Sequence, residues 1–174
     1  MKILKTIAVF FLIVLVIGCA NQTTISDNNR LTGSWKLYQI QQQDSINGKW
    51  EKIGGNLNYT TGYLIYDGQG GMGVHEVLEN YENYHFEDTT KVGRYYVEDL
   101  KHLASNFTYF GRYRILPNKK LIEHTILAHT NPKLWNTTNQ RKYQFKGDTL
   151  ILFPVEAKYN NVRVVWTKIA EMEN

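Results

Sequence analysis

The sequence predicts an all-β protein, an antiparallel barrel of about eight or more strands with one short helix. At least eight short segments carry the residue patterns of strands and are joined by tight connections. Twelve Tyr and four Trp make the chain rich in aromatic residues, which suit β-structure with amphipathic walls. Only one segment has helical periodicity. We expect the sheet to close because closure removes exposed strand edges.

The N-terminus has the pattern of a secretion signal. Lys2 and Lys5 precede an uncharged apolar run from Ile7 to Ile17, in the order that such a signal requires. The run is about half of the ~20 residues that a membrane-spanning helix needs, so a permanent span is disfavoured. The following Gly18-Cys19 resembles the end of a bacterial lipobox, which implies a signal peptide over 1–18 and a lipid on Cys19. Ala20, in place of the Asp that commonly retains enteric lipoproteins in the inner membrane, implies outer-membrane placement if the host has such a membrane.

The chain that remains after cleavage fits one domain. Its formal charge falls from +4 to 4 − 2 = +2 when Lys2 and Lys5 are removed, which does not favour a nucleic-acid partner. Residues 19–29 are small and polar after Cys19 and are expected to form a tether between the lipid and a domain over 30–170. Cys19 is the only cysteine, so the domain can hold no internal disulfide.

The first half of the domain contains four predicted strands. Trp35, Leu37 and Gln39 share one face of the first strand because side chains alternate with a period of two. Asn47-Gly48 is the preferred dipeptide of a tight hairpin turn before a strand with Trp50. The other two strands span 62–66 and 72–78. Their glycine-rich connection is not followed by Lys-Ser/Thr, so a turn is favoured over a phosphate loop.

A polar loop, one helix and five more strands complete the prediction. The acidic, Tyr-rich stretch 79–88 contains Glu79 and Glu82, which could serve acid/base chemistry, but a solvated loop is favoured. The helix is indicated by an apolar stripe with spacings of four, four, three and four: Val92, Tyr96, Leu100, Leu103 and Phe107. The strands span 109–116, 121–130, 140–145, 149–153 and 163–169.

An ordered series of short motifs runs along the domain. The motifs are Leu31-Thr32-Gly33-Ser34-Trp35 with Leu37, Gly62-Tyr63-Leu64-Ile65-Tyr66 with Gly68, Gly70 and Met72, Phe110-Gly111-Arg112-Tyr113, Glu123-His124, Asn131-Pro132, Trp135, Gln140-Arg141 with Tyr143 and Phe145, Gly147-Asp148-Thr149-Leu150 with Leu152, and Val165-Trp166. Together they resemble the bacterial and fungal lipocalin-like domain family. The resemblance implies a lipocalin-type (calycin-type) barrel whose closed end is plugged by Trp35. It also implies a basic residue covering that Trp, either Arg163 or Lys168.

Candidate site residues come from the predicted barrel strands and the motifs. His124 is either a hydrogen-bonded core histidine or a polar group in the lumen, facing Tyr113 across a hairpin. Arg141 matches an arginine of the family and is either a surface charge or an anchor for a carboxylate. His124 and His129 are five residues apart and point to opposite faces unless a bulge intervenes, so no metal site is predicted. The candidate ligand-binding residues are Tyr66, Tyr113, His124, Trp135 and Arg141.

Three functional hypotheses follow. The first is a lipid-anchored envelope protein that binds a small hydrophobic or amphipathic ligand in its barrel, without a cofactor. The second is an isomerase or cyclase that uses Tyr113 and His124 for proton transfer. The third is an adaptor that binds no ligand, with a filled barrel and an exposed patch near Tyr81 and Tyr84. No order of residues typical of a nucleophilic triad is recognisable.

Overall fold

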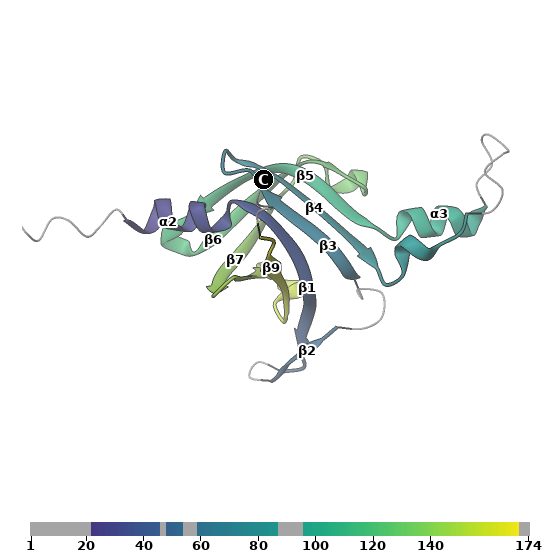
Figure 1. The fold of residues 1–174 in the computed structure, drawn as a ribbon, viewed down its shortest axis with the longest axis horizontal. Coiled ribbons are helices and arrows are strands. Elements are labelled where there is room, and N and C mark those ends of the chain that lie inside the picture. Colours follow the sequence, from purple (N-terminus) through teal and green to yellow (C-terminus); the bar gives the residue numbers. More distant parts are fainter. Residues whose placement is uncertain (1–21, 46–47, 54–58, 87–95, 171–174) are drawn as a thin grey trace, which may run out of the picture.

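The computed structural model describes residues 22–45, 48–53, 59–86 and 96–170 as a closed β-barrel (Figure 1). Its nine-stranded antiparallel sheet has the order β2-β1-β3-β4-β5-β6-β7-β8-β9, and pairing of β1 with β9 closes the barrel. The predicted fold class is therefore confirmed. The strands are β1 Gly33–Gln43, β2 Trp50–Lys52, β3 Tyr59–Tyr66, β4 Gly71–Leu78, β5 Phe107–Leu116, β6 Leu121–His129, β7 Thr138–Lys146, β8 Thr149–Pro154 and β9 Val162–Lys168. Residues 1–21, with the predicted signal and Cys19, lie outside the described ranges.

Two strand irregularities change which side chains face inward. The register between β1 and β9 shifts between Leu37 and Gln39, so Ile40 is buried on the inner face where strict alternation had placed Gln39. A second shift between β5 and β6 lies opposite Phe110 and Gly111. It brings His129 to the buried side that His124 occupies, so the expectation that the two histidines point to opposite faces is wrong.

Residues 22–29 of the segment expected to be a tether lie instead in helix α2, Gln22–Leu31. Asp27 accepts hydrogen bonds from the Tyr143 hydroxyl at 2.7 Å and from Lys120 Nζ at 2.8 Å. Asn28 Oδ1 accepts one from the Tyr113 hydroxyl at 3.0 Å, and Leu31 is fully buried. The helix therefore covers one end of the barrel (Figure 1). Composition alone did not reveal these partners because they are contributed by distant strands.

Trp35 plugs the end of the barrel that α2 covers, as the resemblance implied. Its side chain is 2 % exposed, and its indole N–H donates to the Leu31 carbonyl at 2.8 Å. Lys168 Nζ lies 4.4 Å from the centre of the Trp35 ring, which identifies Lys168 as the covering basic residue. Arg163, the other candidate, lies instead over Trp50. The polar contacts of α2 and the Trp35 plug together define this as the closed end.

The second helix is shorter than predicted and lies beyond the barrel wall (Figure 1). Helix α3 spans Val97–Ala104, while Phe107 belongs to β5 and Val92 lies outside the described residues. Leu100 and Leu103 of the expected apolar stripe are exposed, and the buried residue is Asp99. Asp99 accepts hydrogen bonds from the Tyr84 hydroxyl and the Tyr96 amide. No helix in the described ranges is long and apolar enough to span a membrane.

Candidate functional site

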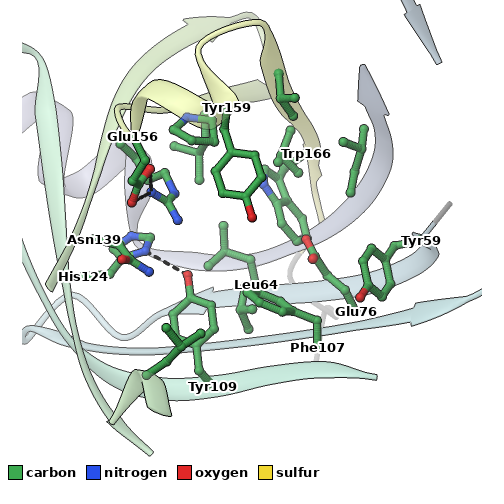
Figure 2. A pocket seen from close by; sticks show the side chains of 18 of the residues that line it. Tyr59, Leu64, Glu76, Phe107, Tyr109, His124, Asn139, Glu156, Tyr159 and Trp166 are labelled. Atoms are coloured by element: carbon green, nitrogen blue, oxygen red, sulfur yellow. Dashed lines mark hydrogen bonds and ion pairs between the residues drawn. The ribbon is translucent and has the colours of Figure 1, made fainter. Parts of the chain in front are cut away.

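A cavity of about 340 Å³ occupies the half of the barrel opposite α2 (Figure 2). It is bordered by the late part of β4 and the early parts of β5, β7 and β9, which are the strand ends farthest from α2 in an antiparallel barrel. The lining residues are mostly apolar or aromatic: Ile40, Tyr59, Leu64, Val74, Glu76, Phe107, Tyr109, His124, Leu134, Asn139, Arg141, Leu152, Pro154, Glu156, Lys158, Tyr159, Val162, Val164 and Trp166. Such a lining is typical of small-molecule sites.

Side-chain size contributes to the cavity in this half of the barrel. Around the closed end the inward positions are large aromatics, and Tyr66 and Tyr113 pack with ring centres 4.7 Å apart. Around the cavity the inward positions of β4 and β9 include smaller residues such as Val74 and Val162. An eight-stranded barrel has room for a small ligand where its inward side chains are short. The distribution of side-chain volume along the strands therefore creates the cavity.

His124 lies at the boundary between the filled and hollow halves and is held by two tyrosines. The fully buried Tyr66 hydroxyl contacts His124 Nε2 at 2.8 Å, with no other partner in the part of the chain that is described, so it donates that hydrogen bond. His124 Nδ1 then carries the proton and donates to the Tyr109 hydroxyl at 3.0 Å (Figure 2). The hydroxyl hydrogen of Tyr109 is consequently available to the cavity that Tyr109 lines.

His124 is held in its neutral form. Burial lowers the pKa of His124 to about 3, and the positive charge of Arg141 lowers it further. The side chain is only 1 % exposed. A histidine that remains neutral far below pH 7 is a poor general base, because it releases a captured proton too readily. The geometry supports a role for His124 in orienting Tyr109.

Glu76 is the buried carboxyl of the cavity. It follows Met72 and Val74 on the inner face of β4 and is 7 % exposed. Its cross-strand neighbours are Gly62 on β3 and Phe107 on β5. A Cβ atom at Gly62 would come within 3.0 Å of Glu76 Cγ, so the glycine leaves room for the carboxyl group. Burial raises the pKa of Glu76 to about 7, although the nearby charge of Arg141 opposes the shift.

Arg141 contributes a paired charge to the same cavity. Its Nη1 lies 2.9 Å from both carboxylate oxygens of Glu156 and donates to the Gln140 carbonyl at 2.8 Å. The Arg141 side chain is 16 % exposed and that of Glu156 is 34 % exposed. The ion pair neutralises the Arg141 charge locally. Nη1 of Arg141 is thus bonded to a carboxylate of the chain itself, and the role of Arg141 as an anchor for a ligand carboxylate stays a prediction.

The predicted ligand-binding residues fall in different places. His124 and Arg141 line the cavity. Tyr66 contacts His124 through its hydroxyl group but is not among the residues that line the cavity. Tyr113 is the cross-strand neighbour of His124, as predicted, but its hydroxyl bonds Asn28 at the closed end. Trp135 is half exposed, is not among the lining residues, and donates its indole N–H to the His129 carbonyl at 2.8 Å.

Sequence reasoning overlooked several residues that line the cavity. Glu76 could have been found, because strict alternation along residues 72–78 places it on the same face as Met72 and Val74. Phe107 shares its face of β5 with Tyr109, but the predicted helical stripe also includes it. Tyr59 and Tyr159 carry no such signal, since they come from a strand end and a turn.

The structure also bears on the enzyme hypothesis and the adaptor hypothesis. Tyr113 and His124 are not hydrogen-bonded to each other, so they do not form the hydrogen-bonded pair that the enzyme hypothesis requires for proton transfer. A cavity is present where the adaptor hypothesis required a filled barrel. Tyr81 and Tyr84, named for the adaptor patch, stack on the ring of His102 in α3. Among the residues described, no three His, Cys, Asp or Glu side chains are placed to hold a metal ion.

Comparison with known proteins gives a family match. A model of the lipocalin-like domain matches residues 32–169. No curated protein matches the chain. A lipocalin-like protein from Bacteroides uniformis is 16 % identical with a TM-score of 0.44, and the match covers 80 % of this chain and 99 % of that one. An uncharacterized protein from Bacteroides eggerthii is 14 % identical with a TM-score of 0.43, over 80 % and 99 % of the two chains. A redesigned β-barrel is 11 % identical with a TM-score of 0.36, over 82 % and 95 %.

Proposed function

The chain belongs to the lipocalin-like domain family, and from that premise we propose that its barrel binds a small, mostly apolar ligand. The observation that carries the proposal is the cavity of about 340 Å³, whose volume lies at the lower end of the range usual for small-molecule sites. Its lining is aliphatic and aromatic with a few polar groups, of which Glu76 and the Tyr109 hydroxyl are available to a ligand. An apolar ligand would gain by leaving water for such a surface.

The proposal can be tested by filling the cavity. Val74 is buried on the cavity wall, and Val74→Trp would place an indole in the space. Ile65 is half exposed on the outer face of the neighbouring strand, so Ile65→Trp makes a comparable change away from the cavity. The probe is N-phenyl-1-naphthylamine, an uncharged apolar dye that fluoresces when it leaves water. We expect Val74→Trp to weaken dye binding about tenfold or more, equal to about 1.4 kcal/mol, and Ile65→Trp to have little effect. Equal binding by both variants would refute the proposal.

We propose in addition that the protein is anchored to the cell envelope by a lipid on Cys19, at the outer membrane where the host has one. The support is the order of charged segment, apolar run and Gly18-Cys19. Helix α2 begins at Gln22, three residues after Cys19, and covers the closed end of the barrel. A lipid at Cys19 would therefore hold the closed end toward the membrane and leave the cavity on the side facing away.

The anchor is tested by metabolic labelling with radioactive palmitate. The wild-type chain should be labelled and should fractionate with membranes, and Cys19→Ala should lose the label because the acceptor thiol is gone. Label that persists in Cys19→Ala would exclude this lipidation site. Separation of the inner and outer membranes then decides the placement expected from Ala20.

A further inference from the structure

The Glu76 carboxyl group is buried in the cavity, and none of the described residues forms an ion pair with it. Within the described residues it has no hydrogen-bond or ion-pair partner, although it is 7 % exposed. Arg141, whose positive charge lowers the pKa of Glu76, is already bonded through Nη1 to both oxygens of Glu156. Leaving an ionised carboxylate buried and unpaired is costly. A group from outside the chain would therefore find an unoccupied partner here.

Aromatic side chains surround this carboxyl group. Phe107 is its cross-strand neighbour, and Tyr59 lies close enough that the Glu76 charge raises the pKa of its hydroxyl, together with burial. The rings of Tyr59 and Phe107 have centres 6.3 Å apart. Figure 2 shows Glu76 reaching into the cavity near Tyr59, Phe107 and Trp166. Ring faces attract cations within about 6 Å of the ring centre.

The charged groups that line the cavity include one buried carboxyl group without an ion pair. The lining residues with carboxylate, ammonium or guanidinium groups are Glu76, Arg141, Glu156 and Lys158. Arg141 and Glu156 neutralise each other. Lys158 is exposed, and its Nζ lies 4.7 Å from the centre of the Tyr159 ring. Of these four, Glu76 is the buried group that has no ion pair among the described residues.

We propose that the cavity selects ligands that carry a protonated amine on an apolar body, with Glu76 as the counter-ion and the surrounding aromatic rings as the wall of the amine site. The inference rests on the proposed ligand-binding function and deepens it. An ammonium group gains from the opposite charge and from the ring faces, and the apolar body gains from the aliphatic remainder of the cavity. An anionic ligand of the same shape would instead meet the like charge of Glu76.

The test compares three probes that share a naphthyl body: 2-(1-naphthyl)ethylamine, 2-(1-naphthyl)ethanol and 1-naphthylacetate. Their affinities for the purified full chain are measured by calorimetry at about pH 8. We expect the amine to bind about tenfold or more tightly than the alcohol, and the carboxylate most weakly. Glu76→Gln should reduce the amine preference to within about twofold while the alcohol still binds. The matched control is Glu123→Gln, which removes a carboxylate paired with Arg114 and Gln140 outside the cavity and should keep the preference.

The outcomes distinguish failure of the amine-selectivity inference from failure of the proposed ligand-binding function. Equal affinity for amine and alcohol in the wild type, tighter binding of the carboxylate, or a preference that survives Glu76→Gln would overturn the inference and leave ligand binding intact. Failure of all three probes to bind would overturn the proposed function and the inference with it. Loss of the preference in Glu76→Gln alone supports both.

A measurement on the wild type avoids dependence on the folding of a variant. The ratio of amine to alcohol affinity should fall between about pH 8 and about pH 5.5 as Glu76 takes up a proton. The other titratable groups facing the site are Tyr59, Tyr109, Tyr159, His124, Arg141, Glu156 and Lys158. His124 stays neutral across this interval, and burial raises the pKa values of Tyr59 and Tyr109 above their ordinary range. A ratio that does not change with pH would overturn the inference.

Discussion

The closed end and the hollow half of the barrel differ in whether particular buried polar groups have hydrogen-bond partners. At the closed end, Asp27 is bonded to Tyr143 and Lys120, and the Trp35 indole N–H is bonded to Leu31. In the hollow half, Glu76 has no partner among the described residues, and Trp166 Nε1 is buried without one. Satisfied buried groups contribute to stability, whereas unsatisfied ones cost free energy. The contrast indicates that the closed end stabilises the fold, and it agrees with the proposal that the hollow half binds a ligand.

The pKa values of the buried carboxyl groups follow the same division. Burial alone would raise the pKa of Asp27, but hydrogen bonds from Lys120 and Tyr143 lower it below its ordinary value. Burial raises the pKa of Glu76 to about 7 because no such bonds compensate. The same chemical group thus favours opposite protonation states in the two halves. Four predictions test this division, beginning with the residue between the halves.

Acid should destabilise the protein through His124. Below about pH 6.5 the unfolded chain binds a proton at this histidine, whereas the folded chain does so only near its pKa of about 3. The free energy of unfolding should therefore fall by up to roughly 5 kcal/mol from this residue as the pH decreases across that window. Chemical denaturation of wild type and His124→Gln over the pH series gives the difference. An imidazole signal of His124 that titrates near pH 6.5 by NMR would contradict the prediction.

Replacement of the plug should cost nearly as much. Trp35→Ala should lower the free energy of unfolding by about 3–5 kcal/mol, because it empties a fully packed position and deletes the bond to Leu31. Trp50→Ala is the matched change at a partly exposed site, where the ring contacts Phe153 and Arg163. It should cost about 1 kcal/mol. Equal denaturation midpoints for the two variants would show that Trp35 does not close the barrel.

Neutralising the unpaired carboxyl group should stabilise the protein at high pH. Because the folded pKa of Glu76 is raised to about 7, the unfolded chain releases the proton at a lower pH and stability is lost as the pH rises to 7 and above. Glu76→Gln should therefore gain up to roughly 3 kcal/mol relative to wild type at about pH 8, and little at about pH 4. Thermal or chemical unfolding at the two pH values measures it. A loss of stability at about pH 8 would mean that Glu76 has a partner.

The smallest expected differences in stability come from removing the hydroxyl groups of two tyrosines, one in each half of the barrel. Tyr143→Phe removes the hydrogen bond to Asp27 and should cost about 1.5–3 kcal/mol, the usual worth of a bond to a charged group. Tyr59→Phe removes a hydroxyl from the cavity wall that has no hydrogen-bond partner in the described chain, so it should change stability by about 0.5 kcal/mol or less. Denaturation of both variants in the absence of ligand tests the difference. Equal costs would remove the distinction between the two halves.

The exposed stripe of α3 shows where periodicity misled the prediction. Leu100 and Leu103 recur at helical spacing, and the segment does form a helix. The pattern indicates which residues share a face of the helix but not whether another element covers that face. In the structure Asp99 is the buried residue and the two leucines are exposed.

The sequence by itself determined the strand segments of the barrel, the hairpins after β5 and β7 and the Trp35 plug, because these depend on local periodicity, turn residues and short motifs. Tertiary structure decided the rest. The polar segment 22–31 is a helix whose Asp27 and Asn28 bond to tyrosines on distant strands, and the local sequence does not reveal these partners. His129 turned inward because a register shift altered the alternation of β6. The cavity required the tertiary structure, since the pairing of β3, β4 and β5 brings Tyr59, Glu76 and Phe107 together, and closure of the barrel adds Tyr159 from the turn before β9.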